Sequence, residues 1–118
     1  MLTTEVYHSG KSALANGCEY KGQPIIISES GGIAINNEDS GWGYGNKVNT
    51  KEAFIKRFDD IATAVKKIPY CCGFCYTQVS DVQQEINGLM DMERNFKVES
   101  EIIQEINERK VGYWRTFM

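Results

Sequence analysis

The sequence predicts an α/β fold in which two parallel strands are each followed by a helix. Three observations predict this arrangement. An unbroken β-branched run spans residues 25–27, a second run rich in aromatic and small apolar side chains spans residues 70–79, and an amphipathic helical pattern follows each run. A continuous apolar run without polar alternation is typical of a strand buried on both faces, as in a parallel sheet. The order strand, helix, strand, helix therefore gives a βαβα unit with a right-handed crossover.

The first strand follows a loop-rich lead-in, residues 1–23, that has no clear period. Pro24 forces the residue before it to be extended and so favours the start of a strand. The apolar run ends at the carboxylate of Glu29, and Gly31 and Gly32 then allow a sharp turn or the close approach of a ligand. Catalytic groups of α/β barrels lie at the C-terminal ends of their parallel strands. Glu29 is thus a candidate catalytic group, and the alternative is an acid that only contacts water.

A long loop rich in Gly, Asn and Asp follows over residues 33–49, and in it Trp42 and Tyr44 alternate with glycines. A loop of this length without regular structure is usually functional or disordered. Trp42 is therefore a candidate contact for the face of a sugar, although its ring could equally pack the loop against the domain. The glycines neither follow the strand directly nor open a helix, so they do not match a phosphate-binding fingerprint.

The first helix is predicted to begin after Thr50, a favourable N-cap residue, and to end before Pro69. Glu52 places an acid in the first turn, where the helix dipole favours it. Apolar residues recur at intervals of three and four and predict a core-facing stripe, while most of the charged residues, Lys66 among them, fall outside it. The stripe consists of Phe54, Ile55, Phe58, Ile61, Ala62, Val65 and Ile68.

The second strand, residues 70–79, contains a CxxC pair, Cys72 and Cys75, which raises the hypothesis of a metal site or a thiol-redox protein. Side chains of a strand alternate between its faces, so residues three apart point to opposite sides and could neither chelate one metal ion nor close one disulfide. No second CxxC and no histidine spacing accompany the pair. The only histidine, His8, is expected at the surface. We therefore expect neither a metal nor a cofactor.

A polar segment that begins near Asp81 is expected to form loops at the same end of the sheet as Glu29. The second helix is predicted over residues 99–109, with three isoleucines as its inner stripe. Residues 110–118 form an apolar tail that needs a surface to cover it.

Length, composition and charge limit the classes of protein that the chain can belong to. With 118 residues, 42% hydrophobic and 25% charged, it has room for one small domain. A net charge of −3 and the lack of a basic patch argue against a nucleic-acid partner. No apolar run is long enough to span a membrane, and the N-terminus lacks the pattern of a signal peptide. Because three of the four cysteines crowd into residues 71–75, unlike a secreted disulfide framework, we expect a cytoplasmic protein with reduced thiols.

Three segments together resemble glycoside hydrolase family 2. They are PIIISESGGI at residues 24–33, GFCYTQVSD at residues 73–81 and EINGL at residues 85–89. The family includes β-galactosidases, β-glucuronidases and β-mannosidases. The resemblance covers the chain from about Tyr20 to Asn107, and it implies that these residues form the seventh and eighth βα units of a TIM barrel.

The resemblance also implies roles for individual residues. Glu29 would be the catalytic nucleophile of a retaining glycosidase, attacking the anomeric carbon to form a glycosyl-enzyme that water later hydrolyses. Tyr76 would line the sugar subsite at the end of the eighth strand. Gln78 and Asp81, in the same stretch, would touch the carbohydrate substrate or hold the loop. Ser30 departs from the family, which usually has Phe or Tyr after the nucleophile. That side chain normally helps to shape the pocket, so the resemblance leaves the choice of sugar open here.

The acid/base glutamate of the family, which follows an Asn at the end of the fourth strand, has no counterpart in this sequence. A retaining glycosidase needs two carboxylates roughly 5–5.5 Å apart. The Asn37-Glu38 pair lies in the wrong loop, and the other pair, Asn107-Glu108, lies on a predicted helix.

A TIM barrel takes about 250 residues, so we expect this chain to be a single partial domain, the C-terminal part of such a barrel. Residues 24–109 would be its two βα units. Because the proton donor is absent, we expect the chain to be inactive alone. Because two parallel strands leave edges and faces uncovered, we also expect the chain either to associate with itself or to repack residues 1–23 and 110–118 onto the exposed faces. The alternative is a stand-alone carbohydrate-binding or assembly module without catalysis.

Overall fold

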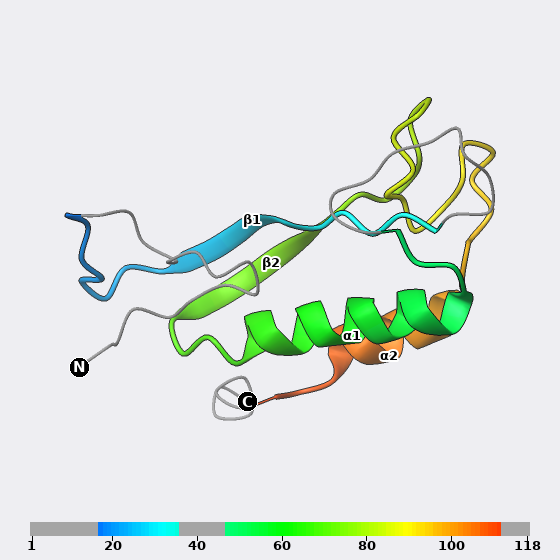
Figure 1. The fold of residues 1–118 in the computed structure, drawn as a ribbon. Coiled ribbons are helices and arrows are strands. Elements are labelled where there is room, and N and C mark those ends of the chain that lie inside the picture. The colour runs from blue at the N-terminus through cyan, green and yellow to red at the C-terminus, as the bar shows by residue number, and fades with distance from the viewer. Residues whose placement is uncertain (1–16, 36–46, 112–118) are drawn as a thin grey trace.

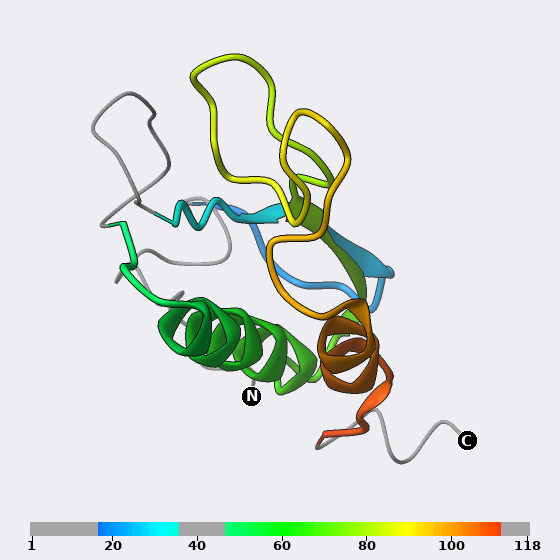
Figure 2. The ribbon, with the colours of Figure 1, turned by 90° about the vertical axis from the view of Figure 1, so that its right-hand side faces the viewer.

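The computed structural model describes residues 17–35 and 47–111. Within these residues the elements are β1 (Ile25–Gly31), α1 (Lys51–Lys66), β2 (Cys71–Thr77) and α2 (Ser100–Glu108). Both helices lie on the same face of the two-stranded sheet (Figure 1), and α2 runs beside α1 (Figure 2). The predicted α/β class and the βαβα order are confirmed. Trp42, His8 and most of the apolar tail lie outside the described residues.

β1 and β2 pair in parallel, as predicted, but their register shifts at two places, between Ile25 and Ile26 and between Ile27 and Ser30. Ile27 lies opposite Phe74 and Ser30 lies opposite Tyr76, so β1 advances three residues while β2 advances two. The extra residue forms a β-bulge around Glu29. A bulge bends its strand and re-aims the side chains next to it. Since Ser30 faces Tyr76, Glu29 and Tyr76 lie at the same end of the sheet.

One face of the sheet is uncovered by the residues that the structure describes. Ile26, in the middle of the β-branched run, is 64% exposed, whereas Ile25 and Ile27 are partly buried. The prediction that this run is buried on both faces is therefore wrong for this chain, because both helices pack on the same face. The expected self-association stays a prediction, which sedimentation at several protein concentrations would test.

α1 begins where the sequence predicts, because the Thr50 side chain accepts a hydrogen bond from the Ala53 N–H at 3.1 Å. Its apolar stripe packs into the core between the sheet and α2, and Phe74 and Tyr76 of β2 pack against that core. α2 is one residue shorter at each end than predicted. The buried core consists of Ile33, Phe54, Phe58, Ala62, Val98, Ile103 and Ile106.

Lys66, predicted on the outer face of α1, is only 1% exposed. Its Nζ donates hydrogen bonds of 2.7 Å to the carbonyl oxygens of Ile106, Asn107 and Arg109. The last carbonyls of a helix lack intrahelical partners, and a cation there also interacts favourably with the helix dipole. The prediction was wrong because the end of α2 packs over the last turn of α1. Lys66 there donates hydrogen bonds to the last carbonyl oxygens of α2.

Candidate functional site

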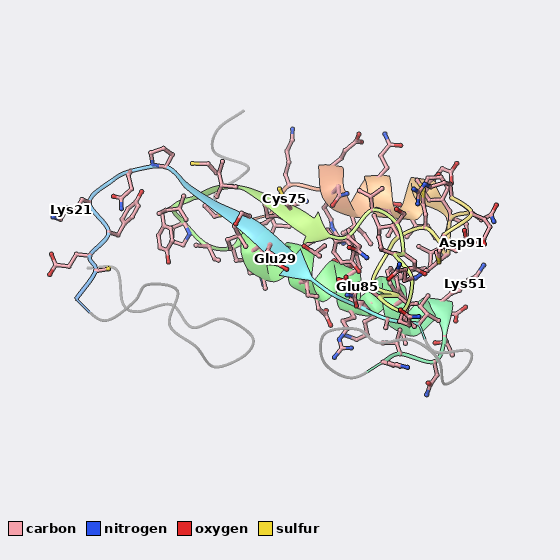
Figure 3. All side chains as sticks on the ribbon, turned by 90° about the horizontal axis from the view of Figure 1, so that it is seen from above. Lys21, Glu29, Lys51, Cys75, Glu85 and Asp91 are labelled. Carbon is pink, nitrogen blue, oxygen red and sulfur yellow. The ribbon has the colours of Figure 1, made fainter. Side chains whose placement is uncertain are left out.

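Glu29 is an exposed carboxylate at the C-terminal end of β1. Figure 3, which looks onto the sheet from the side opposite the helices, shows Glu29 on β1 and Cys75 on the neighbouring β2. The carboxylate makes no hydrogen bond or ion pair with any residue that the structure describes. It is therefore accessible, and only the backbone of β1 fixes the position from which it extends.

The backbone that follows Glu29 is tied to the end of β2. The Ser30 hydroxyl donates a hydrogen bond of 2.8 Å to the Cys75 carbonyl oxygen. The Gly32 N–H donates one of 2.9 Å to the Thr77 carbonyl oxygen. The Ser30 side chain thus joins the two strands.

Tyr76 packs between the end of β1 and α1. A Cβ atom on Gly31 would lie 2.2 Å from Cε2 of the Tyr76 ring, and Gly31 has a φ of +108°, so this position requires glycine. On its other side the ring contacts Phe58 of α1, with ring centroids 5.1 Å apart. The ring is therefore held between the strand backbone and the hydrophobic core, and the sugar-lining role implied for it stays a prediction.

The Tyr76 hydroxyl makes two hydrogen bonds. It accepts one from the Ile33 N–H at 3.3 Å and donates one to the Asn87 carbonyl oxygen at 3.0 Å. Burial, the largest cause, raises the pKa of the Tyr76 phenol well above its usual range. The phenol therefore keeps its proton at neutral pH and remains a donor.

Residues 78–98, here called the rim loop, join β2 to α2 and project beyond the C-terminal ends of the strands (Figure 1). Asp81, within it, is buried, and its Oδ1 accepts hydrogen bonds from the Gly88 N–H at 2.8 Å and from Lys97 Nζ at 2.7 Å. Lys97 Nζ also donates to the Ile86 carbonyl oxygen at 3.0 Å. Of the two roles implied for Asp81, these contacts favour holding the loop over touching the substrate.

Gln78 begins the rim loop, and the Leu89 N–H donates a hydrogen bond of 3.0 Å to its carbonyl oxygen. Its side-chain Nε2 is buried and has no hydrogen-bond partner among the described residues. Buried polar groups normally find partners, so an orphaned donor needs an explanation. Gln78 stays a candidate for contact with substrate.

The sequence singled out Asp81 but missed its partner Lys97, which is 16 residues away. No local pattern marks a pair at that separation, because the two residues meet only when the rim loop closes.

Three of the four cysteines, Cys18, Cys72 and Cys75, are exposed free thiols, and Cys71 is a buried one. Over residues 17–35 and 47–111, no group of three or more His, Cys, Asp and Glu side chains is arranged to hold a metal ion. In the same residues, no helix has the length and apolar character needed to cross a membrane.

The geometry brings Glu29, Tyr76 and the rim loop to one end of the sheet, where parallel strands carry functional groups in α/β folds. No protein-family model matches this sequence, and a search of curated proteins finds no match.

Proposed function

We propose that this chain carries the nucleophile of a retaining β-glycosidase, and that its βαβα unit is the C-terminal part of a TIM barrel. The observation that carries the proposal is the position of Glu29. Its carboxylate is exposed, makes no hydrogen bond or ion pair within residues 17–35 and 47–111, and lies on a β-bulge at the C-terminal end of a parallel strand. A carboxylate that attacks an anomeric carbon must be reachable by the substrate. Bulges are also over-represented beside active sites, where they re-aim a side chain.

The uncovered face of the sheet supports a barrel origin. Each strand of a barrel has one face against the helices and the other against interior side chains from the remaining strands. Ile26, which is 64% exposed on the face away from the helices, fits an interior position whose neighbours belong to other strands. The fold alone does not fix a function, so the proposal depends on the site.

In this proposal Glu29 attacks the anomeric carbon of a terminal β-linked sugar and displaces the leaving group, and water later releases the sugar with net retention. The leaving group needs a proton from a second carboxyl group roughly 5–5.5 Å from the nucleophile. No Asn-Glu pair of this chain fits that role, so the donor comes from another part of the protein and the chain alone is inactive on natural glycosides. We place the protein in the cytoplasm, where its cysteines stay reduced.

The proposal is tested by covalent labelling of the whole protein encoded by the reading frame that contains this chain. The probes are 2-deoxy-2-fluoro-β-glycosides with a dinitrophenyl leaving group, whose departure needs little protonation. Galacto-, gluco-, manno- and glucurono-configured probes cover the sugars of the related family. We expect one of them to add a single sugar to the protein, on Glu29, as located by mass spectrometry of peptides.

Glu29→Gln should remove this adduct, while Glu93→Gln, at an exposed glutamate of the rim loop, should leave it unchanged. Failure of all four probes to label Glu29 would overturn the proposal. Sugar binding without any adduct, unaffected by Glu29→Gln, would indicate a carbohydrate-binding module instead.

A further inference from the structure

We propose that Tyr76 is a positioning residue for Glu29, acting through the backbone that follows the carboxylate and not as a platform for the sugar. The inference rests on the proposed function, in which Glu29 is the nucleophile. It assigns the Tyr76 hydroxyl a role of its own, because a sugar platform needs only an aromatic ring.

The first support is continuous contact along the exit from β1. Four successive residues after Glu29 are each held by the end of β2: Ser30 by the Cys75 carbonyl oxygen, Gly31 by the Tyr76 ring, Gly32 by the Thr77 carbonyl oxygen and Ile33 by the Tyr76 hydroxyl. Tyr76 supplies two of these four contacts. It is thus the side chain that does most to fix the path of the backbone beyond the bulge.

The second support is the other hydrogen bond of the hydroxyl. By donating to the Asn87 carbonyl oxygen, Tyr76 joins the exit of β1 to the rim loop. Asn87 is fully buried, and the next residue, Gly88, donates to Asp81, which is paired with Lys97. The hydroxyl therefore bonds to a fixed part of the loop, and this anchor gives the Ile33 N–H a rigid partner.

The third support is the freedom of Glu29 itself. Its carboxylate has no partner among the described residues, so no side-chain contact fixes its direction. The position of the attacking oxygen depends on the backbone of the bulge and on what holds it. Misplacing a reacting group by 1 Å can cost about 10²-fold in rate, so a tether two to four residues away has a measurable effect.

The test compares Tyr76→Phe, which keeps the ring and removes the hydroxyl, with Tyr70→Phe, which removes a hydroxyl just before the other end of β2. The first readout is amide hydrogen exchange at Ile33, which needs no glycosidase activity. We expect Tyr76→Phe to speed exchange at Ile33 about tenfold, because a buried N–H loses its acceptor. Tyr70→Phe should leave that rate unchanged.

The second readout is labelling of Glu29 by the fluoroglycoside in the whole protein. If the hydroxyl positions Glu29, Tyr76→Phe lowers the rate constant of labelling about tenfold while the apparent affinity for the probe stays the same. A platform role predicts no change, because the phenyl ring remains. Gly31→Ala, whose added Cβ would collide with the Tyr76 ring, should reproduce the loss of labelling with the hydroxyl still present.

Unchanged exchange at Ile33 in Tyr76→Phe overturns the inference, and so does faster exchange with labelling at the wild-type rate. Either result leaves the proposed function intact as long as the wild-type protein is labelled on Glu29. If the wild-type protein is not labelled on Glu29, the proposed function is wrong, and the positioning role of Tyr76, which depends on it, is wrong as well.

Discussion

The two faces of the sheet, built from the same two strands, differ in what surrounds them. On the face toward the helices, Phe74 and Tyr76 pack against a core that includes Phe54 and Phe58, which are 0% and 2% exposed. On the opposite face, Ile26 is largely exposed and no described residue covers it. The difference shows that the described residues build their hydrophobic core on the helix-covered face of the sheet and that Ile26, on the opposite face, has no part in it.

The alternation of side chains between the two faces of the sheet is interrupted at the bulge around Glu29. Regular alternation would send neighbouring side chains to opposite faces, but Ser28 and Glu29 are both exposed. The strand therefore leaves both the Ser28 side chain and the Glu29 carboxylate exposed. Five predictions test which contacts of the helix-covered side and of the rim loop stabilise the fold.

The largest effect is expected from Phe58→Ala. Removing a buried aromatic side chain loses its transfer free energy and leaves a cavity, so the free energy of unfolding should fall by about 3–5 kcal/mol. Ile26→Ala, on the open face, should change it by no more than about 0.5 kcal/mol. Urea unfolding followed by circular dichroism measures both, and equal losses in the two variants would contradict the contrast between the faces.

Asp81→Asn should have the next largest effect, within the rim loop. Breaking a largely buried ion pair by removing one charge typically costs about 3 kcal/mol, because Lys97, whose side chain is only 14% exposed, is left without its charged partner. We expect amide exchange at Gly88, whose N–H bonds to Asp81, to become faster, while exchange within α1 changes little. Asp59→Asn, in the more exposed pair with Arg109, is the control; an equal effect on Gly88 would contradict the assignment.

Lys66→Met should destabilise the packing of α2 on α1 by about 2 kcal/mol, because three carbonyl oxygens lose a charged donor. Lys67→Met, at the exposed neighbour, should change the free energy of unfolding by no more than about 0.5 kcal/mol. Thermal unfolding of both variants measures the difference, and equal melting temperatures would contradict it.

Lys66 should also make the free energy of unfolding depend on pH. Burial, and to a lesser extent Arg109, lower the pKa of Lys66 below its usual 10.5, and Asp59 opposes them. Between the lowered pKa and 10.5 the unfolded chain binds more protons than the folded one, so the contribution of Lys66 to stability rises with pH in that window. The stability difference between wild type and Lys66→Met should change over this range and stay constant at lower pH.

The smallest effect on stability is expected from protonating or replacing Asp91, in the outer turn of the rim loop. The Asn95 N–H bonds to its carboxylate at 2.8 Å and, as the largest cause, lowers the pKa of Asp91 below the usual 3.8. This contact therefore supports the turn above pH 4 and is lost as the pH falls through the lowered pKa. Amide exchange at Asn95 should rise in that acidic range and become independent of pH there in Asp91→Ala, after correction for intrinsic exchange.

The sequence alone was sufficient for the order of the elements, their approximate bounds and the start of α1 at Thr50. These features depend on residues close together in the chain: a β-branched run, a helical apolar period and an N-cap three residues from its donor. It also picked out Glu29, because the end of an apolar run is a local signal. Its role as a nucleophile rests on resemblance and stays a proposal.

Only the tertiary structure decided which groups meet. Lys66 reaches carbonyl oxygens 40 to 43 residues away, and the Tyr76 hydroxyl reaches the Ile33 N–H across 43 residues. The open face at Ile26 is likewise invisible in a run of three isoleucines, which looks the same whether one face or both are covered. Sequence periodicity reports which side of an element is apolar, but the partner on that side depends on how distant segments pack.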